Sequence, residues 1–200
     1  MNANTTMPTI ESTHAVELSR VAKIAVTIGF ALLLVLSSQW KFPVPGTNVP
    51  GTLQTIVVVL AGVALGPRWG TISVLMYLVA GLLISNVFAV AQVTLWSATG
   101  GYLFGFLLAQ PLIGVITRLP SLHPKEYVIR SLIAAVIAHL VILVCGMIVY
   151  AAVFSLPLFL AFEQAILPFL PFTIAKIFTL MLVAPGLMAY VRPHMEPHEV

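Results

Sequence analysis

The stretch from Val49 to Leu83 reads VPGTLQTIVVVLAGVALGPRWGTISVLMYLVAGLL, and it decides the fold class. Two apolar runs lie on either side of GPRWG, and no Lys, Arg, Asp or Glu occurs from Trp69 to Thr117. A helix that spans a membrane needs about 20 mostly apolar residues, and Gly, Pro and charged residues mark the ends of such helices. The stretch therefore predicts two neighbouring membrane helices, at about Thr52 to Leu65 and about Gly70 to Ile84.

The composition of the whole chain excludes a water-soluble protein. Of its 200 residues, 60% are hydrophobic and 8% are charged, and Asp is absent. A soluble domain carries about 25% charged residues, so this chain could not cover its surface in water. The short alternating segments of a membrane β-barrel, about 10 residues each, are also missing. We expect an all-α integral membrane protein.

Gly, Pro and charged residues interrupt the apolar sequence, and their positions predict six membrane helices in a single domain, residues 21–192. Polar tails, residues 1–20 and 193–200, flank this domain and are expected in the cytoplasm. The six helices are expected at about Val21 to Trp40, Thr52 to Leu65, Gly70 to Ile84, Gly100 to Thr117, Arg130 to Phe154 and Phe172 to Val191.

The basic residues predict the orientation of this domain. Lys41 alone lies on one side and Lys176 lies within the last helix, whereas the other cations share the opposite side. These are Arg20, Lys23, Arg68, Arg118, Lys125, Arg130 and Arg192. Loops rich in Lys and Arg face the cytoplasm, and the asymmetry requires an even number of helices. Both termini are therefore expected inside, and the same distribution explains the net charge of +3 without a nucleic-acid partner.

The outer loops are the best candidates for the wall of a small-molecule pocket. They are nearly uncharged and rich in Gly, Pro, polar and aromatic residues, a composition that suits such a wall. Lys176 lies about one turn inside the last helix, where a cation is costly unless it snorkels or has a function. Thr173 lies on the same helical face. Glu163 is the only outer acid and is interpreted as a solvated charge, a partner of Lys176 or a ligand acceptor.

Other polar residues within the helices have less specific interpretations. Gln54 opens the second helix and could either cap it or face the pocket. His139 is interpreted as packed or bonded to its own helix, because no second His or carboxylate within one turn completes a metal site. We find no catalytic residues, no cofactor motif and no phosphate-binding loop. If transport is active, its ATPase must be another subunit.

Four motifs, in order, carry a resemblance to a known family. They are the opening stretch, then NVF (Asn86 to Phe88), SATGGYLFGFLLAQPLIG (Ser97 to Gly114) and LPFLPFTIAK (Leu167 to Lys176). The opening stretch is similar to the pattern VPxTxQTxxVxLAGxxLG of the BioY family. These proteins are the biotin-specific substrate-binding S components of energy-coupling-factor (ECF) vitamin transporters.

The resemblance implies six helices in the bacterial inner membrane, with biotin bound among the first, third and fifth loops on the outer side. It also implies two further kinds of partner, a membrane coupling subunit and two cytoplasmic ATPases, although some members act without them. The coupling subunit would dock on a small-residue face of the first helix, where Ala25 and Gly29 are the nearest match. Phe88, Trp96 and Tyr102 would surround the apolar part of biotin.

The polar contacts that the resemblance implies are altered in this chain. Thr173 replaces the Asp of the last motif, whereas its Lys is kept as Lys176. Polar groups that would fix biotin are therefore sought elsewhere, and neutral acceptors such as Thr173 itself could replace the carboxylate. The candidates are Gln54, Asn86, Gln92, Thr99, Glu163, Thr173 and Lys176.

Three alternatives to biotin transport stay open, and Thr173 prompts the first of them. The ligand could be another small vitamin or a biotin precursor. The chain could be a membrane enzyme with Glu163 or His139 as its base, or a structural membrane subunit without a ligand.

Overall fold

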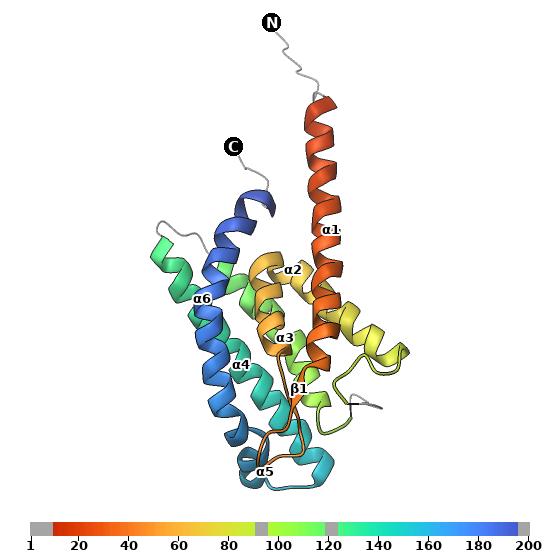
Figure 1. The fold of residues 1–200 in the computed structure, drawn as a ribbon, viewed down its shortest axis with the longest axis vertical. Helices are drawn as coiled ribbons and strands as arrows, with labels where there is room; N and C mark the ends of the chain where they lie inside the picture. The colour runs from red at the N-terminus through yellow and green to blue at the C-terminus, as the bar shows by residue number, and fades with distance from the viewer. Residues whose placement is uncertain (1–9, 91–95, 119–123, 196–200) are drawn as a thin grey trace, which may run out of the picture.

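The structure is a computed structural model that describes residues 10–90, 96–118 and 124–195. Its helices pack into one bundle, with a short hairpin and a short helix at one end (Figure 1). The elements are α1 (Ile10–Gln39), β1 (Lys41–Phe42), β2 (Gly51–Thr52), α2 (Gln54–Leu83), α3 (Gly100–Arg118), α4 (Pro124–Phe154), α5 (Leu158–Ala165), the 3-10 turn η1 (Leu167–Phe169) and α6 (Leu170–Met195).

The described residues include five helical segments that are long and apolar enough to cross a membrane. Large apolar side chains cover their outer surfaces; Leu182, for example, is 84% exposed, and Leu36 and Leu140 are also exposed. Lipid solvates such a surface, whereas a monomeric soluble protein rarely exposes contiguous apolar patches of this kind. The chain is therefore a multi-pass, all-helical membrane protein, as its composition predicts.

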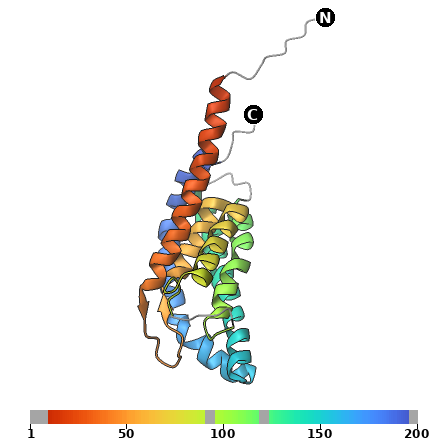
Figure 2. The ribbon, with the colours of Figure 1, turned by 90° about the vertical axis from the view of Figure 1, so that its right-hand side faces the viewer.

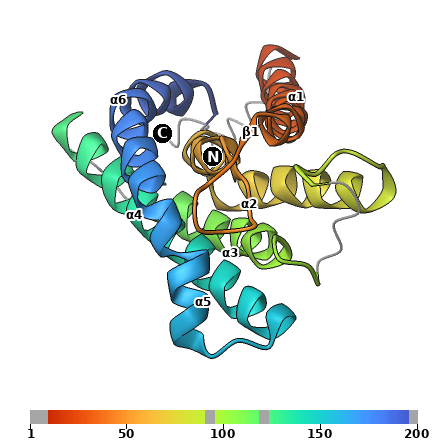
Figure 3. The same ribbon diagram turned by 60° about the horizontal axis from the view of Figure 1, so that its bottom comes forward.

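The first helix is longer than the sequence predicts, because α1 begins at Ile10 rather than near Val21. The apolar part of α1, Arg20 to Gln39, agrees with the predicted span. The polar residues before Arg20 continue the same helix, and their composition favours helix because Glu, Ala and Leu have high helix propensity. In Figure 3, α1 lies at the edge of the bundle, where it packs mainly against α2.

α2 contains both helices that the opening stretch predicts, and it is interrupted between them. Gly66 has φ 74° and ψ −172°, which are not helical angles, and Pro67 follows it. A positive φ is easily adopted only by Gly, and Pro suits the first turn of the helix that follows. The Arg118 guanidinium of α3 donates a hydrogen bond to the Leu65 carbonyl, 3.0 Å away, so the end of the first half is capped.

The centre of the bundle contains fully buried side chains from four helices. They include Tyr77 of α2, Ile113 of α3, Ile142 of α4 and Leu180 of α6. α3 and α4 approach closely because Gly105 has no side chain: a Cβ there would lie 2.7 Å from the Ile142 Cα. Small residues at such crossings allow helices to pack tightly in lipid. This packing fixes the starts of α3 and α6 around the middle of α4.

One end of the bundle contains structure that the sequence predicted only as loops. β1 and β2 form an antiparallel pair, with Lys41 opposite Thr52 and Phe42 opposite Gly51. α5 and η1 then pack below the start of α6 (Figure 1). In the hairpin, Gly46 has φ +86° and the Thr47 N–H donates to the Val44 carbonyl, so the first VPGT is a turn.

The start of α1 and the end of α6 lie at the same end of the molecule, opposite α5 and the hairpin (Figures 1 and 2). The two halves of α2 run in different directions on either side of Gly66 (Figure 1). The described chain therefore ends at the same end of the bundle at which it began.

Candidate ligand-binding site

A cavity lies at the hairpin end of the bundle, among the starts of α2, α3 and α6 and the middle of α4. It encloses about 680 Å³ of empty space, part of which is open to solvent. The wall is mostly apolar and aromatic, with contributions from Phe88, Leu103, Phe106, Ile142 and Phe169.

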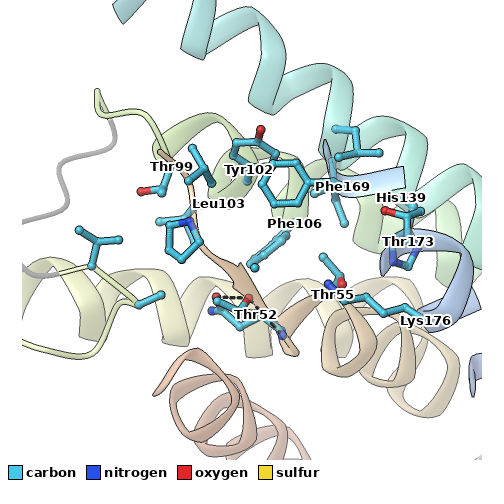
Figure 4. Close-up of a pocket in the computed structure, with 18 of the residues that line it drawn as sticks. Thr52, Thr55, Thr99, Tyr102, Leu103, Phe106, His139, Phe169, Thr173 and Lys176 are labelled. Carbon is cyan, nitrogen blue, oxygen red and sulfur yellow. Dashed lines mark hydrogen bonds between the residues drawn. The ribbon is translucent and has the colours of Figure 1, made fainter. Parts of the chain in front are cut away.

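Six of the residues that we expected at a ligand site line this cavity. They are Gln54, Phe88, Thr99, Tyr102, Thr173 and Lys176. Thr99 and Tyr102 lie at one end of the pocket and Thr173 and Lys176 at the other, as Figure 4 shows. Four separate segments of the chain supply these residues, so the site exists only in the folded bundle.

Three other expected residues are not brought to the cavity wall. Asn86 is exposed and has φ 65°, a left-handed conformation that Asn tolerates better than most residues. Its carbonyl, rather than its side chain, is bonded, and it accepts from Gln39. Trp96 is 72% exposed, and Glu163 is exposed on α5. Gln92 lies outside the described residues.

Gln54 is held by protein groups on both sides of its amide. Its Nε2 donates to the Tyr77 hydroxyl at 2.6 Å, and its Oε1 accepts from the Thr52 hydroxyl at 3.1 Å. Tyr77 in turn packs edge-on against Phe88, with ring centroids 5.4 Å apart. Gln54 therefore joins both halves of α2 to the loop that carries Phe88, and it gives this wall a fixed shape.

Tyr102 fixes the opposite wall. Its hydroxyl donates to the Ala165 carbonyl at 2.7 Å, and its ring centroid lies 5.7 Å from that of Phe169. Gly146 of α4 makes room for this ring, because a Cβ at Gly146 would lie 2.4 Å from it. These contacts connect α3 to the short helix α5, which the sequence did not predict.

Four polar side chains gather at the other end of the cavity: Thr55, His139, Thr173 and Lys176 (Figure 4). The His139 Nδ1 lies 2.8 Å from the Ala135 carbonyl, which agrees with our interpretation of a helix-bonded imidazole. The His139 Nε2 and the Thr55 hydroxyl are buried without a hydrogen-bond partner in the described structure. Most buried polar atoms in proteins have hydrogen-bond partners. A polar group of a ligand could therefore form the missing hydrogen bonds at this end of the cavity.

Sequence reasoning did not place Thr55 or His139 in the site. Thr55 is one residue beyond Gln54 in the motif QT, and this adjacency was the available signal. His139 gave only a weak signal, since a single imidazole in an apolar helix is commonly a packed residue. Its place beside Lys176 depends on how α4 crosses α6, which local sequence does not encode.

A second, more open hollow lies outside the cavity and against the hairpin. Lys41, which donates to the Ala89 carbonyl at 3.1 Å, lies on its wall. The two hollows share four lining residues: Val49, Pro50, Ala89 and Val90. Within the described chain, no group of three His, Cys, Asp or Glu residues could hold a metal ion.

The surface of α1 is open at the residues expected to bind a partner. Ala25 is exposed, and a Cβ built on Gly29 would meet nothing within 4 Å. A helix from another protein could therefore approach the α1 backbone closely at this point.

A comparison with protein-family models identifies the chain. The model described as the BioY family matches residues 7–193. The chain belongs to the BioY family. This assignment agrees with the resemblance of the four motifs, and it covers the cavity and all of its lining residues.

Curated members of the BioY family are similar to this chain over part or most of its length. A "Probable biotin transporter BioY" of Lysinibacillus sphaericus is 37% identical over 115 residues, which are 56% of this chain and 58% of that protein. The "Biotin transporter BioY" of Thermotoga maritima is 38% identical over 94 residues, which are 54% of its length. The chain thus matches little more than half of these two relatives. The "Biotin transporter BioY2" of Lactococcus lactis subsp. cremoris is 30% identical over 171 residues, or 84% of this chain and 88% of the relative.

A solved structure supports the fold. It is the S-component for biotin from an ECF-type ABC transporter, with a TM-score of 0.75 and 20% identity over 88% of this chain and 97% of that chain. The bundle described above is therefore the fold of an ECF S component.

Proposed function

We propose that the chain binds biotin in the cavity and serves in its uptake as the S component of an ECF-type transporter. The observation that carries the proposal is a cavity with an aromatic wall and one polar end, built from the family's own motifs. The apolar wall suits the thiophane ring and acyl chain of biotin, and the polar end suits its ureido ring or carboxylate. Biotin would be bound and released without chemical change.

The proposed topology has six membrane crossings, with the two halves of α2 crossing separately. The common end of α1 and α6 would lie in the cytoplasm, and the cavity would open outside. Arg68, Arg118 and Lys125 lie near the turn and helix ends at the proposed inner side, which agrees with the preference of basic residues for the cytoplasm.

The proposed partners are a membrane coupling subunit and two cytoplasmic ATPases. The open surface at Ala25 and Gly29 supports docking of the coupling subunit on α1. A ligand shifts a conformational equilibrium only through its differential affinity for the two states. Net uptake against a gradient would therefore need the ATPases.

Equilibrium binding of radiolabelled biotin to the purified full chain tests the proposal. We expect saturable binding at submicromolar concentrations, competed by unlabelled biotin. Absence of saturable binding below micromolar concentrations would reject biotin as the ligand. Saturable binding of another vitamin or of a biotin precursor in the same assay would favour the second candidate, which the Thr173 position suggests.

A further inference from the structure

We propose that His139 is a ligand-contacting, specificity-determining residue, whose Nε2 accepts a hydrogen bond from an N–H group of the bound molecule. The proposal rests on the proposed function, since it concerns the same cavity and takes the ureido ring of biotin as the donor. It assigns to α4 a polar contact that none of the four sequence motifs contains.

The hydrogen bond of the other ring nitrogen fixes the role of Nε2. The His139 Nδ1 lies 2.8 Å from the Ala135 carbonyl oxygen, and this oxygen can only accept. Nδ1 therefore carries the proton. The ring is 3% exposed and shares an apolar cavity with the Lys176 ammonium, so a second positive charge there would be costly. In the neutral ring with a proton on Nδ1, Nε2 is an acceptor.

The acceptor has no partner among the described protein groups, although it is completely buried. Leaving a buried polar atom unsatisfied costs about 1–3 kcal/mol, and this cost is removed if a ligand supplies the missing donor. The Thr55 hydroxyl is unsatisfied in the same way and lines the same cavity. Thus α2 and α4 each place one polar atom without a hydrogen-bond partner at the same cavity.

The neighbouring groups indicate the chemistry of the ligand at this end. Lys176 and Thr55 can donate to an oxygen, whereas His139 Nε2 can only accept from an N–H. A urea or amide, which has an N–H next to a carbonyl oxygen, satisfies all three groups. A carboxylate would instead place an anionic oxygen against the Nε2 lone pair. We therefore expect a urea or amide group, such as the ureido ring of biotin, rather than a carboxylate at this end.

The test combines variants of His139 with an altered ligand. In His139→Leu the ring is replaced by an apolar side chain, and in His139→Gln an acceptor oxygen is kept at a similar reach. The ligands are biotin and its two carbamate analogues, in each of which one ring N–H is replaced by oxygen. Dissociation constants are measured by equilibrium binding and competition on the purified full chain.

We expect the original protein to prefer biotin over at least one analogue by about 10-fold or more, which corresponds to about 1.4 kcal/mol. His139→Leu should weaken biotin binding by a similar factor and lose the discrimination, because the acceptor is gone. His139→Gln should keep the discrimination between biotin and the analogues. Thr173→Asp in the His139→Leu background should restore affinity, since it places a carboxylate acceptor next to the same space.

Two results would overturn the proposal. One is unchanged biotin affinity in His139→Leu; the other is an equal loss for biotin and both analogues, which a purely structural role of the ring would produce. If His139→Leu does not fold, failure of His139→Gln to retain the discrimination is decisive instead. Failure of the original protein to bind biotin would reject the proposed function and is recognisable before any variant is made.

Discussion

At the scale of single residues, the polar end of the cavity contains a cation, Lys176, with no carboxylate partner among the described residues. Glu126 forms an ion pair with Arg130 at 3.0 Å, far along α4 from the cavity. Glu163 is exposed on α5 and does not line the cavity. Lys176 is thus available to a ligand oxygen, and hydrogen bonds to charged groups contribute about 1.5–3 kcal/mol.

Lys176→Met tests this role, because Met keeps most of the length and apolar character of the Lys stem. We expect the affinity for biotin to fall by about 10-fold or more, through loss of the charge-assisted hydrogen bond. Equilibrium binding of biotin to each purified variant measures the affinity. Lys125→Met is the matched control, since Lys125 is exposed near the start of α4 and does not line the cavity. Equal affinities of the two variants would contradict a ligand contact at Lys176.

At the scale of helices and turns, the sequence predicted the apolar helices well because their ends are marked locally. Gly66 and Pro67 lie where the structure interrupts α2, and Phe154 ends α4 as expected. α5 was missed because it has only eight residues and lies between prolines, so it lacks the length of a helix that spans a membrane. Six candidate site residues line the cavity. Thr55 follows one of them directly, whereas His139 could be placed only from the crossing of helices distant in sequence.

Gly105 lies at the crossing of α3 and α4, where there is no free space for a side chain. Gly105→Ala would place a Cβ 2.7 Å from the Ile142 Cα, so the two helices would have to separate. We expect a loss of about 1–3 kcal/mol in the free energy of unfolding, the usual cost of overpacking. Thermal denaturation in detergent measures the loss as a lower midpoint.

Gly29→Ala is the control for this substitution. Gly29 is also helical, but a Cβ there meets nothing within 4 Å. Ala has higher helix propensity than Gly by about 1 kcal/mol, so the melting temperature of Gly29→Ala should be unchanged or higher. A similar decrease in both variants would show that the loss at Gly105 does not come from the close approach of α3 and α4.

At the scale of the whole molecule, the proposed orientation places α5 outside the cell and the start of α4 inside. Cys145 is the only cysteine, so Cys145→Ser provides a background without thiols. Glu163→Cys and Lys125→Cys then introduce exposed thiols at opposite ends of the bundle. A membrane-impermeant maleimide should label the first variant in intact cells and the second only after permeabilisation. The reverse pattern would invert the topology.

The wall shared by the two hollows has a kinetic consequence. Val49, Pro50, Ala89 and Val90 line both the cavity and the outer hollow, so the two spaces adjoin at these residues. All four residues belong to connecting segments, whereas the transmembrane helices lie to the sides. Loops move in nanoseconds to microseconds, whereas collective helix movements take microseconds to milliseconds. If the proposed ligand enters between the two hollows, it passes loop residues rather than transmembrane helices, and we expect its entry to follow the time scale of loop motion.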